Sequence, residues 1–177
     1  MSIQIKISKK RISYKKAMLL LNKRVDEVKS GSNNELIWVL EHPTTFTAGV
    51  SYNRKDILDK RIKILKTNRG GKITLHNPNQ KIIYFVINLN KRKKDKKNIG
   101  IWVKKRKIAA IGLRVSRWIA YHGCSINISN NLNEYLKIIP CGLDNKKVTS
   151  INNEVNLKPI NYETKLANIF IKNINKI

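Results

Sequence analysis

Apolar residues recur at helical spacing in three segments of the chain. Between Ser13 and Ser30 they recur every three or four positions, which predicts an amphipathic helix. Ser13 is a suitable N-cap, and Gly31 follows the last turn. Tyr162–Ile174 is periodic enough to predict a closing helix, and Leu132–Ile139 predicts a short helix broken by the proline that follows it.

Short runs rich in β-branched and aromatic residues predict strands between these helices. Glu35–Leu40 reads as a buried strand, and Lys72–Leu75 and Lys81–Leu89 read as two more. The turn residues His76–Asn79 separate the last two, so we expect a hairpin there. Four further strands are predicted, at Ile99–Val103, Lys107–Val115, Trp118–Tyr121 and Ser125–Ile128. The mixed order predicts an α+β (mixed α/β) fold rather than a doubly wound sheet.

Length and composition indicate a folded globular protein. The chain has 177 residues, 41% of them hydrophobic, which predicts a single domain over residues 1–177. No apolar run approaches the roughly 18 residues needed to cross a bilayer, and the N-terminus lacks the apolar stretch of a signal peptide. We therefore expect a cytoplasmic protein, whose two cysteines, Cys124 and Cys141, are free thiols.

The charge is strongly basic, with 37 Lys+Arg against 11 Asp+Glu and a formal net charge of +26. An acidic macromolecular partner would explain this balance. A compositional drift is the favoured explanation, because Lys, Asn and Ile are abundant throughout the chain and Lys91–Asn98 is a charge run typical of a solvated loop. Nucleic acid is the less favoured partner, since Trp38, Trp102 and Trp118 lie in apolar runs typical of a core.

Candidate chemistry lies among the rare residue types. Cys141, between a proline and a glycine, is either an exposed nucleophile or a small buried hydrophobe. A dyad of His122 and Cys124 is a weaker candidate, because residues two apart in a strand share a face without contacting usefully. No spacing typical of a zinc site is present, and Gly70-Gly71-Lys72 lacks the upstream glycine of a phosphate-binding loop.

Several motifs in order closely resemble the octanoyltransferases of protein lipoylation. The matching segments are Arg69–His76 (RGG-x-x-T-x-H), Gly100–Val103 (G-x-W-V), Lys107–Gly112 (K-I-A-x-x-G), Pro140–Gly142 (P-C-G) and Val148–Ser150 (V-T-S). The resemblance implies a fold similar to the catalytic domain of biotin and lipoate protein ligases. It also implies that Cys141 is the nucleophile of a two-step acyl transfer, and that Lys107 beside it lowers its pKa.

The resemblance further implies the substrates. Octanoyl, or lipoyl, would come from the phosphopantetheine thioester of acyl carrier protein. It would pass to a lysine on the lipoyl domains of 2-oxoacid dehydrogenases or on the glycine-cleavage carrier protein. No ATP, metal, membrane or nucleic acid is expected to take part. The residues matching the family's acyl-binding stretches are Arg69, Gly70, Gly71, Lys72, Ile73, Thr74, Leu75, His76, Ala110, Ile111, Gly112, Gly123, Cys124 and Ser125.

Two features depart from the family pattern. Asn77 and Asn79 replace glycines of the family's His-Gly-Pro-Gly-Gln turn, although asparagine tolerates positive φ well. A family helix is also missing between residues 90 and 98, which would leave apolar sheet surface uncovered. An inactive or weakened family member is therefore one alternative. An ATP-dependent lipoate-protein ligase, which needs no Cys141 nucleophile, is another.

Overall fold

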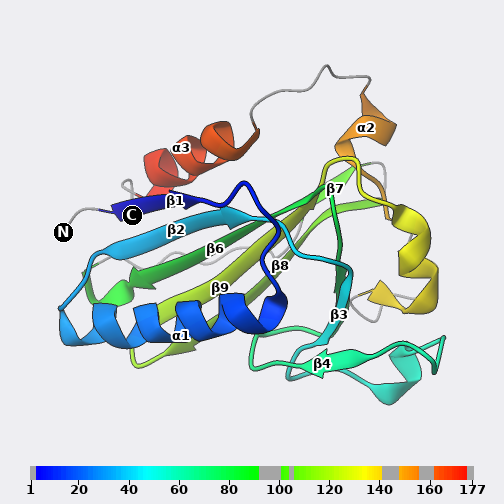
Figure 1. The fold of residues 1–177 in the computed structure, drawn as a ribbon, viewed down its shortest axis with the longest axis horizontal. Helices are drawn as coiled ribbons and strands as arrows, with labels where there is room; N and C mark the ends of the chain where they lie inside the picture. Colours follow the sequence, from blue (N-terminus) through cyan, green and yellow to red (C-terminus); the bar gives the residue numbers. More distant parts are fainter. Residues whose placement is uncertain (1–2, 92–100, 104–105, 141–147, 156–161, 175–177) are drawn as a thin grey trace.

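The strands form two sheets in the computed structural model, which describes residues 3–91, 101–103, 106–140, 148–155 and 162–174 (Figure 1). The larger sheet consists, in spatial order, of β1 (Ile3–Ile7), β2 (Glu35–Leu40), β6 (Gln80–Asn88), β9 (Ile119–Asn127), β8 (Arg106–Ser116) and β7 (Ile101–Val103). The smaller sheet consists of β4 (Ile64–Lys66), β3 (Thr45–Ala48) and β5 (Ile73–His76). The predicted mixed α+β fold is confirmed.

Two helices cover opposite faces of the larger sheet. Helix α1 (Tyr14–Ser30) begins at Ser13, whose hydroxyl accepts from the Lys16 amide, and ends at Gly31 with φ of 78°. It contacts β6 and β9, whereas α3 (Tyr162–Ile174) contacts β1 and β2. Both predicted helices are confirmed. The remaining helical turns of the described residues are η1 (Arg54–Asp56), η2 (Leu89–Lys91), η3 (Leu132–Lys137) and α2 (Ile151–Glu154).

Strand β2 consists of a nearly continuous apolar run because both of its faces are buried. Leu36, Trp38 and Leu40 belong to the core under α1, whereas Ile37 and Val39 belong to the core under α3. A strand buried on both faces gains from apolar residues at every position, because neither face meets water. The expectation that Trp38 lies in the core is confirmed.

The hairpin expected between Lys72–Leu75 and Lys81–Leu89 is wrong, although both strands exist. Strand β5 pairs with β3 in the smaller sheet, and β6 pairs with β2 and β9 in the larger one. The turn between them, where Asn79 has φ of 64°, carries the chain from one sheet to the other. Strand β5 finds its partner in β3, which the sequence patterns did not predict.

The strands predicted at Trp118–Tyr121 and Ser125–Ile128 are a single strand, β9. It pairs with β8, and a two-residue turn connects the two strands. In this turn Arg117 and Trp118 have φ of 49° and 65°. Two consecutive positive φ values are typical of the tight turns that match strand twist. Trp118 lies at this turn and is 54% exposed, so its predicted place in the core is wrong.

The predicted loop Lys91–Asn98 and the missing helix at 90–98 lie largely outside the described residues. Leu113 and Val115 lie on the same face of β8 as Ile111, since alternate residues of a strand share a face. Their side chains are 43% and 57% exposed, respectively. Ile111 pairs with Cys124, which belongs to the cluster under α3. The face that α3 covers at β1 and β2 therefore presents apolar side chains to solvent at β8.

Candidate active site

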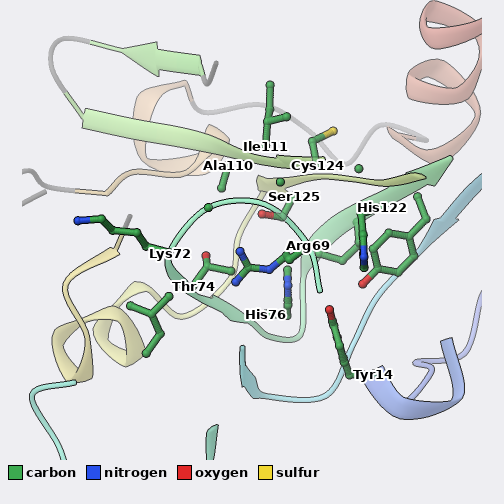
Figure 2. Close-up of a pocket in the computed structure, with 16 residues that line it drawn as sticks. Tyr14, Arg69, Lys72, Thr74, His76, Ala110, Ile111, His122, Cys124 and Ser125 are labelled. Carbon is green, nitrogen blue, oxygen red and sulfur yellow. The ribbon is translucent and has the colours of Figure 1, made fainter. Parts of the chain in front are cut away.

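A cavity of about 50 Å³ lies between the two sheets. The smaller sheet contributes residues of β5, and the larger sheet contributes residues of β6, β8 and β9 (Figure 2). Every predicted substrate-binding residue except Gly70 and Leu75 lines it. The lining residues that the sequence did not single out for binding are Tyr14, Ile82, Tyr84 and His122. The structure thus gathers segments far apart in sequence around one space, while their role in binding stays a prediction.

Gly70 and Leu75 lie beside the cavity rather than on its wall. The Gly70 amide donates a 3.0 Å hydrogen bond to the Leu113 carbonyl, which ties the 69–71 loop to β8. Leu75 is fully buried in a separate cluster that includes Phe46 and Tyr135. Both residues therefore stabilise the elements that line the cavity without lining it themselves.

Close backbone contacts explain the glycines of the 69–71 loop. A Cβ on Gly49 would lie 2.3 Å from the Gly71 carbonyl oxygen, and Gly71 has φ of 83°. The Arg69 guanidinium turns back and donates 2.9 Å hydrogen bonds to the carbonyls of Gly70 and Thr47 and to the Thr47 hydroxyl. Packing therefore excludes a Cβ at Gly49, and the left-handed backbone favours glycine at position 71.

Buried aromatic rings form one end of the cavity. His42 Nδ1 lies 2.5 Å from the Ile12 carbonyl oxygen, which can only accept, so Nδ1 carries the hydrogen. His42 Nε2 consequently accepts from the Tyr84 hydroxyl at 2.8 Å. His76 stacks on Tyr14 with ring centroids 5.8 Å apart. Burial, reinforced by His42 and Arg69, holds the pKa of His76 well below its ordinary value.

His122 points into the cavity because its backbone departs from strand geometry. Its φ is 69°, and its ring stacks on that of Tyr121 at 4.9 Å, although neighbours in a regular strand point to opposite faces. Nε2 lies 2.7 Å from Asn68 Oδ1. Burial, and then the charges of Arg69 and Arg114, lower the pKa of His122 to about 4. The sequence contained no pattern that predicts this conformation.

Cys124 does not form a catalytic pair with His122. Figure 2 shows its sulfur directed away from Arg69 and His76, and the side chain packs into the cluster under α3. Burial raises the pKa of the Cys124 thiol to about 12. The thiol is therefore neutral at physiological pH and unsuited to nucleophilic attack.

Lys107 lines a smaller adjoining cavity of about 10 Å³ together with Pro140. The two cavities share Thr74 and Ala110. Cys141, the predicted nucleophile, lies outside the described residues. Pro140, the residue before Cys141, therefore lines the same cavity as Lys107, the predicted activating residue. This cavity adjoins the larger one.

Two other features, a metal site and a membrane-spanning helix, are absent from the described ranges. No group of three or more His, Cys, Asp or Glu side chains there is arranged to hold a metal ion. None of the helices of the described chain has the length and apolar character required to cross a membrane. Whether catalysis proceeds without ATP or metal stays a prediction.

Comparison with known proteins identifies the family. The family model described as lipoyl protein ligase A/B catalytic domain matches in two segments, residues 13–99 and 94–171. The two segments overlap at residues 94–99, largely within the stretch 90–98 where the sequence predicts a missing helix. The break in the match to the family pattern thus falls at the predicted position.

Curated relatives match over most of their length. The octanoyltransferase of Wolbachia sp. subsp. Brugia malayi (strain TRS) is 38% identical, and the alignment covers 97% of each chain. That alignment spans 202 positions, more than the 177 residues of this chain, so the relative carries residues that this chain lacks. The octanoyltransferase of Anaplasma phagocytophilum (strain HZ) is 36% identical over 85% of this chain and 88% of its own.

Solved structures show the same fold at low sequence identity. P. falciparum LipL1 in complex with lipoate superimposes with a TM-score of 0.67 and 16% identity, over 99% of this chain and 62% of LipL1. Lipoate-protein ligase A bound with ATP gives a TM-score of 0.63 and 12% identity, over 94% of this chain and 82% of its own. The predicted likeness to lipoate ligase folds is confirmed. On the family model and the curated relatives together, the chain belongs to the lipoyl protein ligase A/B catalytic domain family.

Proposed function

We propose that this protein is an octanoyltransferase that moves an octanoyl group from acyl carrier protein to a lysine of a lipoyl domain. The supporting observation is the cavity between the sheets, which gathers the predicted acyl-binding residues beside Lys107 and Pro140. Both curated relatives described above are named octanoyltransferases. Polar side chains also line this cavity, but most of its accessible surface is apolar, which suits an alkyl chain.

The first step forms an acyl-enzyme. The Cys141 thiolate attacks the thioester carbonyl carbon of the donor, a carbon–sulfur bond to Cys141 forms, and the bond to the phosphopantetheine sulfur breaks. The departing thiolate takes up a proton. An ammonium at Lys107 favours the Cys141 thiolate over the thiol, because opposite charges attract. Backbone N–H groups of the glycine-containing loops would stabilise the oxyanion of the tetrahedral intermediate.

The second step releases the product. The lysine ε-amine of the lipoyl domain attacks the Cys141 thioester and loses a proton, a carbon–nitrogen bond forms, and the bond to the Cys141 sulfur breaks. Amides are more stable than thioesters, so the transfer runs downhill without ATP. The acceptors would be lipoyl domains of 2-oxoacid dehydrogenases and the glycine-cleavage carrier protein.

Intact-mass spectrometry tests the proposal. Wild type and Cys141→Ser are incubated with octanoyl-acyl carrier protein, without ATP, and then treated with hydroxylamine. We expect a hydroxylamine-sensitive octanoyl adduct on wild type only, and its loss when an apo lipoyl domain is added. Absence of the adduct on cooperatively folded wild type would favour the inactive alternative. Acceptor modification that requires free octanoate and ATP, and survives Cys141→Ser, would instead indicate a ligase.

A further inference from the structure

Buried polar side chains connect the two cavities. Gln80 has no exposed surface, and its Nε2 donates to Asn127 Oδ1 at 2.8 Å and to the Tyr135 hydroxyl at 2.9 Å. Because that nitrogen supplies both donors, Gln80 Oε1 is the acceptor facing His76 Nδ1, 3.1 Å away. Gln80 therefore holds the ring of His76 at the wall of the larger cavity, which is called the acyl cavity from here on.

Asn127 continues this chain of hydrogen bonds toward Lys107. Its Nδ2 donates to the Thr149 carbonyl at 2.9 Å, and the Thr149 amide donates to the Lys107 carbonyl at 2.9 Å. Asn127 is only 4% exposed, and it lines the smaller cavity together with Lys107 and Pro140. One amide thus links the segment after residues 141–147 to both cavities.

We propose that Asn127 is a positioning residue, which holds Val148–Ser150 against Lys107 and couples that segment through Gln80 to the acyl cavity. This inference rests on the proposed function. Both ends of the amide are used: Oδ1 accepts from Gln80, and Nδ2 donates to the Thr149 carbonyl. Nucleophilic attack depends on placement at the sub-ångström level, so a small shift of this segment relative to Lys107 slows acylation.

Other contacts retain the segment when the Asn127 donor is removed. The Thr149 hydroxyl donates to Glu154 at 2.5 Å, and Glu154 forms an ion pair with Arg106 at 2.9 Å. The Ser150 side chain accepts from the Asn153 amide and begins α2. A variant at Asn127 is therefore expected to fold with a displaced segment rather than to unfold.

Asn127→Asp tests the proposal with little change of shape. The aspartate keeps the oxygen that accepts from Gln80 but presents a second acceptor to the Thr149 carbonyl, so these groups repel. We expect single-turnover acylation by octanoyl-acyl carrier protein to slow about tenfold or more, while the KM for this donor changes less than about twofold. The pH profile of Cys141 alkylation should also shift, which a loss of stability alone would not cause.

Asn130→Ala is the matched control. Asn130 is equally buried, at 5% exposed, and its Nδ2 donates to the same Asn127 Oδ1 at 3.2 Å. Its substitution should lower the melting temperature but leave the acylation rate within about twofold of wild type. If Asn127→Asp does not fold, Asn127→Ser, whose hydroxyl is too short to reach the Thr149 carbonyl, replaces it.

The outcomes separate this inference from the proposed function. Wild type that forms no adduct would contradict the proposed function itself. Wild type that acylates, with Asn127→Asp within about twofold of its rate or with an unchanged alkylation profile, would overturn only the positioning role. Equal slowing of Asn127→Asp and Asn130→Ala would also overturn it, because a general loss of stability would then be sufficient.

Discussion

The backbone amide of Thr149 donates a 2.9 Å hydrogen bond to the carbonyl oxygen of Lys107. Val148, the neighbour of Thr149, forms a parallel bridge with Lys107. Pro140 and Val148, which flank residues 141–147, both line the cavity that Lys107 lines. The described ends of the segment that contains Cys141 therefore lie next to Lys107, and this placement makes the proposed activating role testable.

Lys107→Ala should raise the apparent pKa of Cys141 alkylation. Removal of a nearby ammonium withdraws the charge that favours the thiolate. Alkylation rates by iodoacetamide, measured from pH 6 to 10, check this. Lys66→Ala, at an exposed position of β4, removes the same charge from a distant surface and should leave the profile unchanged. Identical profiles for all three proteins would remove the activating role of Lys107.

Cys124 should resist alkylation in the folded protein. Its pKa of about 12 leaves roughly one thiolate in ten thousand at pH 8. Native wild type should take up one equivalent of iodoacetamide, and native Cys141→Ser should take up none until denatured. Mass spectrometry of the intact protein gives this stoichiometry. Rapid labelling of native Cys141→Ser would show that the Cys124 thiol is accessible and ionised.

His122 should make stability fall as the solution becomes acidic. Its pKa is about 4 in the folded state against about 6.5 in the unfolded state, so the unfolded chain binds more protons between these values. The contribution to stability is fully present above about pH 6.5 and is lost as the pH falls toward 4.

The matched variant is His122→Asn, because asparagine also tolerates positive φ. Between pH 7 and 5 the free energy of unfolding should fall by about 2 kcal/mol more in wild type than in this variant. Urea denaturation at both pH values measures the difference. Burial also lowers the pKa of His42 and His76, so the variant should retain part of the slope. Equal slopes would contradict the role of His122.

The sequence predicted elements whose information is local. Capping residues and periodicity identified α1, and the continuous apolar run identified β2, because both patterns depend on neighbouring residues. The hairpin prediction failed because strand pairing depends on β3, a partner remote in sequence. The exposure of Trp118 was missed because residue type alone does not show that a turn with positive φ occupies Arg117 and Trp118.

For the candidate site, the glycine-containing motifs and the family resemblance predicted most of the residues that line the cavity. Tyr14 and Tyr84 were missed because they belong to a helix and a strand that also read as ordinary core. The sequence predicts a role for His122 only as a partner of Cys124. Its place in the cavity depends on one dihedral angle, which no periodicity encodes.

Gly123→Ala and Gly31→Ala should differ greatly in cost. A Cβ on Gly123 would lie 1.8 Å from the Ile83 carbonyl oxygen, so β6 and β9 would have to separate. We expect a loss of more than about 3 kcal/mol in the free energy of unfolding. Gly31 has open space around it and only a positive φ, so the loss should be about 1 kcal/mol. Thermal and urea unfolding of both variants measure these values.

Salt should weaken the reaction if the basic charge steers acidic protein partners. The formal net charge of +26 would attract an acidic carrier protein at long range, and added salt screens this attraction. We expect kcat/KM for octanoyl-acyl carrier protein to fall as NaCl rises from 25 to 300 mM. An acyl donor on a neutral phosphopantetheine mimic should show little change. Equal behaviour of the two donors would attribute the charge to compositional drift.

The exposed side chains of Leu113 and Val115 have a consequence for how the molecules behave in concentrated solution. Mutual repulsion between highly cationic molecules keeps these apolar patches apart at low ionic strength. Screening removes that repulsion while leaving the patches available for self-association. The colloidal stability of this protein should therefore be greatest in dilute buffer, and light scattering should detect reversible clustering as salt is added.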